Sequence, residues 1–408
     1  MPNIKADFPV FANNPDLIFL DSTSSTQKPK VVIEGIKTYL ENDYSNIHRG
    51  SYDLAQRSEK MYENSKKKVA DFLNASSWRE VIYSSNSTYA SNLLITSIRR
   101  TWLLKKWDKV LVSIVEHHAN VVPWLILKEE LDIDIEYVKV LPDFSLDFDD
   151  LEKKLENPKV KIVSMTHVSN VTGEVFDLEK VWALVKAVPE RLFIIDWSQS
   201  FPHLKVDVQK LQCDALFFTG HKFGADSWIG ILWWKTDFLT NLQPGLSWWW
   251  AISWVKQTCF KEAGLPDRFE PWTPNLSWAV SVLKALEYME SIWGYSEIEK
   301  IEHNLVKYFL EKLDKFEYKD TFRLIWWTSA ETKAAVFSFT IEWIHSHDVA
   351  DFLAEQGICI RAWQHCAEPF MWELWISSSC RASFWIYNDN SDIDRFFEEL
   401  KNCINLLG

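Results

Sequence analysis

A lysine that follows a buried strand is the chemical centre of this sequence. Lys222 closes the segment Thr219-Gly220-His221-Lys222, which comes directly after the apolar run 215–218. A short, continuous apolar run rich in aromatics is typical of a buried strand, and ligands usually bind at the carboxyl edge of an α/β sheet. A desolvated lysine amine beside groups that hold a phosphate is what a Schiff-base cofactor requires. Taken alone, however, such a lysine is more often a surface residue in a turn.

Polar clusters also follow the other predicted strands. The strands at 80–84, 109–114, 160–165 and 192–195 lead into Ser85-Asn86-Ser87-Thr88, Glu116-His117-His118-Ala119-Asn120, Thr166 to Asn170, and Asp196 with Gln199. A sixth strand is expected at 229–233, and helical segments such as 177–188 separate several of the strands. This alternation predicts a mostly parallel sheet covered by helices on both faces. All the polar clusters then share one rim of that sheet, which favours a binding site.

Two of these clusters leave alternatives open. Small hydroxyl residues at the turn 85–88 suit an anion at a helix N-terminus, but they are equally compatible with an ordinary helix cap. His117 and His118 are adjacent and therefore point to different sides, so they do not form a two-ligand metal site. We expect one of them to face a cofactor while the other packs.

Composition narrows the class of protein. The chain has 408 residues, a formal net charge of −13 and six scattered cysteines without metal-ligand spacing. The acidic balance makes nucleic acid an improbable partner, and no apolar run approaches the roughly 18 residues of a membrane helix. The cysteine usage is typical of reduced thiols, so we expect a cytoplasmic protein. We expect an N-terminal segment at 1–20, a large domain at 21–280 and a smaller C-terminal α+β domain at 281–408.

Eight stretches of the sequence resemble cysteine desulfurases. They are Leu20-Asp21-Ser22, NIHRG (46–50), EHHANVVPW (116–124), THVSNVTGE (166–174), TGHKFG (219–224), RFEPWTPN (268–275), RAWQHCAEP (361–369) and SCRASFWIYN (379–388). The resemblance is to the SufS-like branch of the class V, fold-type I pyridoxal-phosphate enzymes, and it runs through the whole chain in collinear order. It implies a fold-type I α/β transferase with pyridoxal 5′-phosphate as cofactor.

The resemblance also implies a role for each matching residue. Lys222 would bind the cofactor covalently, Asp196 would pair with the ring nitrogen, Gln199 would bond the phenolic oxygen, and His117 would stack on the ring. Thr88, Thr219 and His221 would hold the phosphate, with Thr273 reaching across from the second subunit of a homodimer. The predicted substrate-binding residues are Asn170, Arg361, Arg395 and His48.

Cys380 is the predicted nucleophile. By resemblance, its thiolate would take the sulfur of L-cysteine as a persulfide and release L-alanine, with Lys222 and His117 as the other catalytic residues. The three serines before Cys380 predict a mobile, exposed segment, which a reactive thiolate requires. Packed, inert thiols are expected at Cys213, Cys259, Cys359 and Cys403, whereas Cys366 is intermediate because it lies in a predicted active-site turn.

The product and its recipient leave alternatives open. The resemblance implies sulfur transfer to a SufE- or SufU-like acceptor for iron–sulfur cluster assembly or another pathway. A selenocysteine lyase or a cysteine sulfinate desulfinase of the same family shares the chemistry at Cα. A non-catalytic sulfur-transfer scaffold is the third possibility.

Tryptophan is anomalously frequent. The chain has 23 Trp and 11 Gly, whereas ordinary usage of about 7% would give roughly 28 glycines. The resembling family usually has glycine where this chain has Trp107, Trp197, Trp228, Trp248, Trp249, Trp250, Trp272 and Trp363. We hypothesise that the source reads UGA as glycine and that a different code table printed tryptophan. Literal tryptophans would favour a poorly folded protein or the scaffold.

Overall fold

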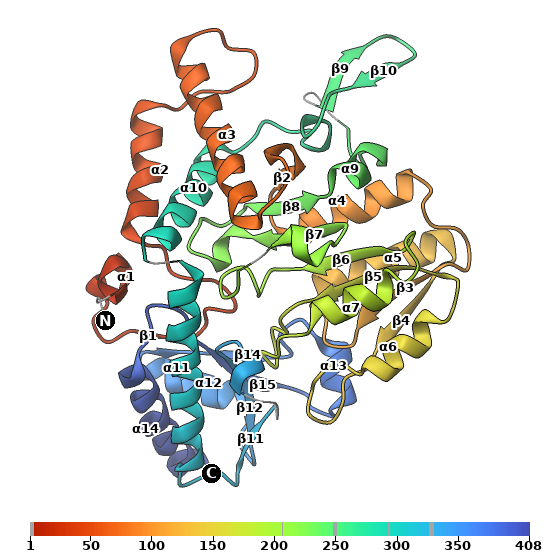
Figure 1. Ribbon diagram of the computed structural model, residues 1–408. Helices are drawn as coiled ribbons and strands as arrows, with labels where there is room; N and C mark the ends of the chain where they lie inside the picture. The colour runs from red at the N-terminus through yellow and green to blue at the C-terminus, as the bar shows by residue number, and fades with distance from the viewer. Residues whose placement is uncertain (1–3, 206, 248–250, 293, 326–329) are drawn as a thin grey trace.

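The computed structural model describes residues 4–205, 207–247, 251–292, 294–325 and 330–408 (Figure 1). A seven-stranded sheet forms the centre, and its spatial order is β2 (Val81–Ser84), β8 (Gly230–Trp234), β7 (Ala215–Thr219), β6 (Leu192–Asp196), β5 (Val160–Thr166), β3 (Lys109–Ser113) and β4 (Asp134–Val138). Only β8 runs antiparallel to its neighbours among these strands. The prediction of a mostly parallel sheet is therefore confirmed.

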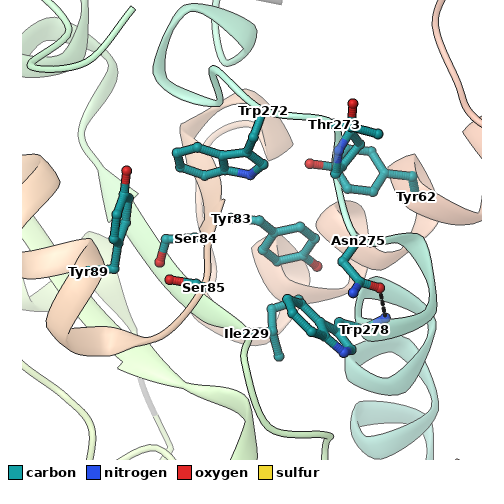
Figure 2. Close-up of a pocket in the computed structure, with 11 residues that line it drawn as sticks. Tyr62, Tyr83, Ser84, Ser85, Tyr89, Ile229, Trp272, Thr273, Asn275 and Trp278 are labelled. Carbon is teal, nitrogen blue, oxygen red and sulfur yellow. Dashed lines mark hydrogen bonds between the residues drawn. The ribbon is translucent and has the colours of Figure 1, made fainter. Parts of the chain in front are cut away.

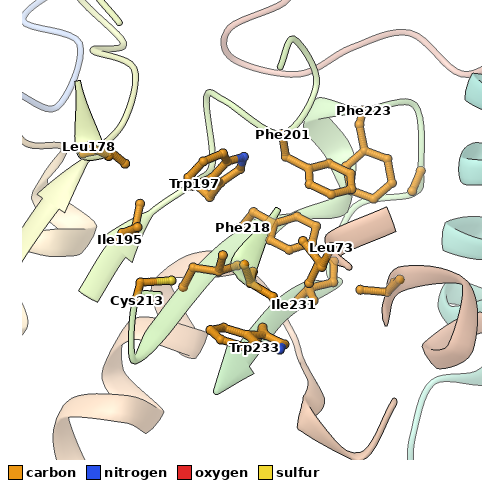
Figure 3. Packing of buried hydrophobic residues seen from close by; sticks show 14 of the residues in the cluster. Leu73, Leu178, Ile195, Trp197, Phe201, Cys213, Phe218, Phe223, Ile231 and Trp233 are labelled. Carbon is orange, nitrogen blue, oxygen red and sulfur yellow. The ribbon is translucent and has the colours of Figure 1, made fainter. Parts of the chain in front are cut away.

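Alternating side chains of the central strands feed two separate cores. Ile195, Phe218 and Ile231 pack on one face with Leu73 (Figure 3), while their chain neighbours, such as Phe217, pack on the other. Successive strand side chains point to opposite faces, so a fully buried strand needs cover on both sides. The first face is covered by α2 (Lys30–Asn42), α3 (Asp53–Leu73), α6 (Phe148–Leu155), α7 (Leu178–Val185), α8 (Val208–Leu211) and α10 (Leu276–Ser291), and the second by α4 (Ser87–Arg100), α5 (Val122–Leu131) and α9 (Thr236–Asn241).

The C-terminal part builds a second core around an antiparallel sheet. Its strands are ordered β11 (Phe322–Leu324), β12 (Val336–Ile341), β15 (Ser379–Ser383) and β14 (Arg361–Trp363). Helices α11 (Tyr295–Asp314), α12 (Ser346–Glu355) and α14 (Asn390–Leu407) pack against it. A short helix, α13 (Glu368–Glu373), lies between β14 and β15 in the chain.

The N-terminal segment lies against this C-terminal part. After α1 (Pro9–Asn13), strand β1 (Ile18–Phe19) pairs in parallel with β13 (Ile358–Cys359), and Asp21 bridges to Ser383. This packing brings residues 18–26 beside the carboxyl rim of the large sheet. The exact domain boundaries at residues 20 and 280 stay a prediction.

Two details of the chain differ from the predicted elements. Strand β4 was not predicted, because Asp134 and Glu136 make it read as polar, although it is an edge strand that tolerates charge. The apolar pattern predicts helical structure over residues 279–315, and the structure divides this stretch between α10 and α11. Among the described residues, no helix combines the length and apolar character needed to cross a bilayer.

Six described tryptophans occupy a backbone conformation that favours glycine. Their φ angles lie between 56° and 126°, at Trp102, Trp107, Trp228, Trp343, Trp363 and Trp375. Two of them follow helices α4 and α13 directly, where an αL residue closes the last turn: the N–H of Ile376, for example, donates to Met371 O at 3.0 Å across Trp375. L-residues pay about 1–2 kcal/mol in this conformation, and glycine does not.

Three of these positions belong to the predicted set of misprinted glycines. They are Trp107, Trp228 and Trp363, whereas Trp197 and Trp272 do not have positive φ and Trp248 to Trp250 lie outside the described residues. Trp197 is instead buried, with its ring 4.4 Å from that of His167. The UGA hypothesis stays a prediction. Backbone geometry supports it at Trp107, Trp228 and Trp363, and says nothing for or against it at Trp197 and Trp272.

Replacing Trp343 or Trp375 by glycine should stabilise the protein. Both side chains are exposed, at 89% and 95%, so little burial is lost while the αL strain disappears. The expected gain is about 1 kcal/mol each in the free energy of unfolding, measured by urea titration. Trp372→Gly is the matched control, because Trp372 is also exposed but lies inside α13. Its replacement should cost about 1 kcal/mol, and the same loss at Trp343 and Trp375 would contradict the interpretation.

Candidate active site

A cavity of about 340 Å³ lies at the carboxyl rim of the seven-stranded sheet, where the C-terminal part meets it. Its volume is at the lower end of the range usual for small-molecule sites. The lining comes from five loops of the large sheet, the N-terminal segment and the turn after β14. It comprises Thr23, Ser24, Asn86, Ser87, Thr88, His117, Asn170, Gln199, His221, Lys222, Arg361, Ala362, Trp363, His365, Cys366 and Arg381.

Lys222 ends a single helical turn directly after β7. Burial lowers the pKa of its amine to about 8, and the carboxylate of Asp196 partly opposes that shift. Burial in turn raises the pKa of Asp196, opposed by a hydrogen bond from Ser198 and by Lys222. A substantial fraction of the Lys222 amine is therefore neutral, and so nucleophilic, near neutral pH.

The turn that carries Lys222 is held from the N-terminal segment. Several donors converge on the carbonyl oxygen of His221: Thr26 N at 2.9 Å, Thr26 Oγ1 at 3.1 Å and Ser25 Oγ at 3.3 Å. The Thr26 hydroxyl also accepts from Gly224 N at 2.8 Å. These contacts fix the main chain on both sides of Lys222.

His117 is a neutral imidazole at the wall of the cavity. Burial and the Lys222 charge lower its pKa to about 3, and its Nδ1 accepts from Ala119 N at 3.1 Å. Nε2 therefore carries the proton. The preceding Glu116 is buried and accepts from Asn120 Nδ2 and Thr166 N, both at 2.8 Å, which ties this turn to β5.

The residues predicted to hold a phosphate do not all lie at the cavity. Ser87 and Thr88 begin helix α4 and line the cavity beside His221, while the Asn86 side chain caps the helix by accepting from Tyr89 N at 2.8 Å. Thr219 does not line the cavity. Its hydroxyl donates to Ile229 O at 3.2 Å, since the strand register turns it away from the rim.

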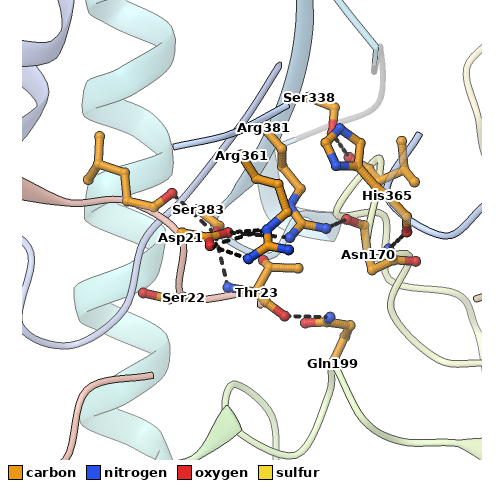
Figure 4. A network of polar contacts seen from close by, with 12 residues as sticks. Asp21, Ser22, Thr23, Asn170, Gln199, Ser338, Arg361, His365, Arg381 and Ser383 are labelled. Carbon is orange, nitrogen blue, oxygen red and sulfur yellow. Dashed lines mark hydrogen bonds and ion pairs between the residues drawn. The ribbon is translucent and has the colours of Figure 1, made fainter. Parts of the chain in front are cut away.

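Two arginines and one aspartate form a polar network beside the cavity (Figure 4). Arg361 pairs bidentately with Asp21 through Nε at 3.2 Å and Nη2 at 2.9 Å. Arg381, which was not predicted, is buried and donates from Nη1 to Asn170 O at 3.0 Å. The Asn170 amide donates to His365 O at 2.7 Å, so its side chain supports a neighbouring turn as well as lining the cavity.

The prediction that Cys380 is exposed on a mobile segment is wrong. Cys380 lies in the middle of β15, is 1% exposed, and donates its thiol to Ser346 O at 3.3 Å. Burial raises its pKa, which disfavours the thiolate. Because successive strand residues face opposite sides, the register that buries Cys380 directs Arg381 towards the cavity. The alternation alone predicts opposite faces for Cys380 and Arg381, but not which of the two residues faces the cavity.

Cys366 is the cysteine that the described structure places at the cavity. It is exposed, and it lies in the turn after β14. Lys222, Arg361 and Arg381 line the same cavity, so three cations lie near this thiol. A thiol surrounded by cations is the setting in which thiolates form and react.

Besides Asp196, Thr219 and Cys380, three predicted residues lie outside the lining of this cavity. Arg395 lies on α14, where it pairs with Glu398 at 3.2 Å and Glu399 at 2.8 Å, and its role at the substrate stays a prediction. His48 lies 3.1 Å from Glu59 on the surface. Thr273 lines a separate cavity of about 290 Å³ together with Trp272 and three tyrosines, Tyr62, Tyr83 and Tyr89 (Figure 2).

The lining fits pyridoxal 5′-phosphate. Gln199 donates from its amide nitrogen to Thr23 O at 3.0 Å, which leaves its buried Oε1 without a hydrogen bond among the described residues. The Nε of buried Arg381 likewise has no hydrogen-bond partner among the described residues. A reactive amine, a buried carboxylate and hydroxyls at a helix N-terminus complete the set of groups that this cofactor uses.

Comparisons with known proteins agree with this geometry. Residues 18–396 match the family described as Aminotransferase class-V. The chain is 34% identical to a cysteine desulfurase of Wigglesworthia glossinidia brevipalpis over 97% of this chain and 96% of the other, and 34% identical to a probable cysteine desulfurase of Pyrococcus abyssi over 99% and 98%. The apo structure of a cysteine desulfurase from Thermococcus onnurineus NA1 is 32% identical, with a TM-score of 0.93 over 99% of this chain and 98% of that one.

The Lys222–Asp196 interaction gives a test without turnover. Asp196 raises the pKa of Lys222, so Asp196→Asn should move the pH midpoint of Lys222 modification below about 8. The measurement is the rate of acylation of Lys222 against pH in cofactor-free protein, read by peptide mass spectrometry. Glu116→Gln is the control, because Glu116 is buried nearby but is not among the groups that shift Lys222. An unchanged or higher midpoint in Asp196→Asn would contradict the pairing.

Proposed function

Because the chain belongs to the Aminotransferase class-V family and within it to the cysteine desulfurases, whose cofactor is pyridoxal 5′-phosphate, we propose that it transfers the sulfur of L-cysteine to Cys366. The observation that carries the proposal is the position of this thiol. Cys366 lines the same cavity as Lys222, whereas Cys380 is packed in the C-terminal core.

The residues that would hold the cofactor follow from the lining. Lys222 would bind it covalently, with Asp196 at the ring nitrogen and Gln199 Oε1 at the phenolic oxygen. His117 would cover the ring, and Ser87, Thr88 and His221 would hold the phosphate. When bound, the cofactor supplies an electron sink that makes the substrate Cα–H acidic. The lowered pKa of Lys222 suits this amine for removing that proton and returning one.

The arginines would orient the substrate. Arg381 Nε has no hydrogen bond among the described residues and Arg361 flanks the cavity, so both guanidinium groups are available to the carboxylate of L-cysteine. Asp21 holds both of them in place, through Arg361 Nη2 at 2.9 Å and Arg381 Nη2 at 3.5 Å. A guanidinium fork matches a carboxylate bidentately.

The sulfur step is a displacement at the substrate's sulfur. The Cys366 thiolate attacks that sulfur, so an S–S bond forms and the bond between substrate Cβ and sulfur breaks. The electron pair of the broken bond stays with the carbon, which takes up a proton and becomes the methyl group of L-alanine. Cys366 is left as a persulfide. A thiol placed for this attack favours L-cysteine over cysteine sulfinate, whose loss of sulfur dioxide needs no nucleophile.

We extend the proposal to the fate of the sulfur. An exposed persulfide at Cys366 can be reached by a partner thiol, so a SufE- or SufU-like acceptor and iron–sulfur cluster assembly remain the expected destination. Location in the cytoplasm also stays a prediction.

A homodimer would complete the site. Thr273 is exposed beside an apolar cavity lined by Trp272, Tyr89 and Trp278. The nearby hairpin β9 (Ile252–Val255) and β10 (Phe260–Glu262) extends from the body (Figure 1) with Val255 71% and Phe260 43% exposed. Exposed apolar side chains of this kind commonly mark a protein interface. We propose that a second copy covers them.

Cysteine variants test the sulfur step. Cys366→Ala should lose alanine formation from L-cysteine by at least about a hundredfold and accumulate no persulfide, because the sulfur has no acceptor. Cys380→Ala, the matched control, should keep activity within about threefold. Borohydride reduction with pyridoxal 5′-phosphate should attach the pyridoxyl group to Lys222 in both variants. The reverse pattern of activity would reinstate Cys380.

Charge on the hairpin tests the dimer. Val255→Glu with Phe260→Glu should shift sedimentation from dimer towards monomer, since buried unpaired carboxylates oppose association. Val188→Glu, at an exposed apolar side chain outside the hairpin, is the control. A dimer that persists in the hairpin variant would contradict this interface.

A further inference from the structure

The turn that carries Cys366 has an unusual backbone. His365 and Cys366 are consecutive and both left-handed, with φ of 56° and 55°. Residues with a Cβ avoid this region, and two in succession persist only when surrounding contacts over-determine the conformation. The contacts that hold this turn therefore decide where the thiol lies.

Two of these contacts come from loops at the rim of the large sheet. His118 N donates to Cys366 O at 2.9 Å, and Asn170 Nδ2 donates to His365 O at 2.7 Å (Figure 4). Both carbonyl groups of the left-handed pair are thus fixed by residues outside the C-terminal part. On the opposite side, His365 Nε2 lies 3.0 Å from Ser379 Oγ of β15.

The side chain of His118 also contacts the same turn, through Glu368. Its Nε2 contacts the Glu368 carboxylate and lies 3.3 Å from the Glu368 N–H. A protonated Nε2 donates to the carboxylate, and a bare one accepts from the N–H, so either form holds Glu368. Because Glu368 begins α13 two residues after Cys366, His118 contacts both ends of the segment 366–368.

We propose that His118 is a positioning residue, which with Glu368 holds the Cys366 turn against the cofactor-facing His117 turn. The proposal rests on the proposed role of Cys366. His117, whose imidazole lines the cavity, is followed directly in the chain by His118, which holds the turn that carries the thiol. The distance between the thiol and the substrate site is therefore set by the rim of the large sheet, rather than by the packing between the two parts of the chain.

The experiment compares His118→Ala, His118→Gln and Glu368→Ala in the cofactor-loaded enzyme. His118→Ala and Glu368→Ala should lower kcat for alanine formation about tenfold, since small displacements of a reacting group are costly. KM for L-cysteine and cofactor affinity, measured by absorbance titration, should stay within about twofold, because neither residue lines the cavity. His118→Gln can still donate to the carboxylate and should recover most of kcat. Glu373→Ala, exposed on the same helix α13, is the matched control and should not change kcat.

A second readout does not depend on turnover. The rate of alkylation of Cys366 by iodoacetamide, followed by mass spectrometry, should fall at least about threefold in His118→Ala, because the thiol leaves its position beside Lys222, Arg361 and Arg381. Unchanged kcat and unchanged alkylation in both alanine variants would overturn the proposal. Equal losses of cofactor affinity and kcat without rescue by glutamine would also overturn it, since they indicate a general structural role. An active Cys366→Ala enzyme would refute the proposed function, while the alkylation rates would still decide whether His118 holds the turn.

Discussion

The site depends on burying one amine beside one carboxylate. Asp196 ends β6, and Lys222 lies in the turn directly after the adjacent parallel strand β7, so the sheet itself brings them together. Burial disfavours the charged form of both groups, and the charge of each partly stabilises the charged form of the other. The result is an amine with a pKa of about 8, close enough to neutrality to act as nucleophile and base. The apolar layers on both faces of the sheet are what keep water from reversing this shift.

The N-terminal segment and the C-terminal part then supply what the sheet lacks. Residues 21–26 cross the rim, where Asp21 holds two arginines and Thr26 holds the carbonyl of His221. The C-terminal part contributes Arg381 from β15 and Cys366 from the turn after β14. The large sheet thus supplies the rigid cofactor site, and the C-terminal part supplies the accessible thiol. The hydrogen bonds of His118 and Asn170 to the turn at 365–366 join the two parts.

Sequence patterns predicted the sheet and its rim because both depend on local properties. An apolar run followed by polar residues identifies a strand end wherever the chain folds. The structure gathers Lys222, Gln199, His117 and Thr88 around one cavity with Asp196 near Lys222, and their roles stay predictions. The same pattern does not show which of Cys380 and Arg381 faces the cavity. Their sides of β15 are fixed by pairing with β12 and β14, which are distant in sequence. At Arg395, which the structure places on α14 beside Glu398 and Glu399, the sequence leaves no signal that distinguishes an ion pair from a substrate contact. Thr273 and His48 lie outside the cavity of one chain, and the role predicted for Thr273 needs a second copy, which no pattern within a single chain can supply.

Left-handed backbone in this chain has two physical origins, and the surroundings distinguish them. At His365 and Cys366 the conformation is held by hydrogen bonds from other parts of the molecule, so side chains with a Cβ are tolerated and the strain serves to position a thiol. At Trp102 and Trp375 only the helix end itself demands positive φ, and the indoles point into solvent with 76% and 95% of their surface exposed. A helix end of this kind favours glycine, which has no Cβ, and an exposed indole adds no packing that would offset the strain. At these helix ends the φ values favour glycine over tryptophan, which agrees with the hypothesis that some of the printed tryptophans stand for glycine.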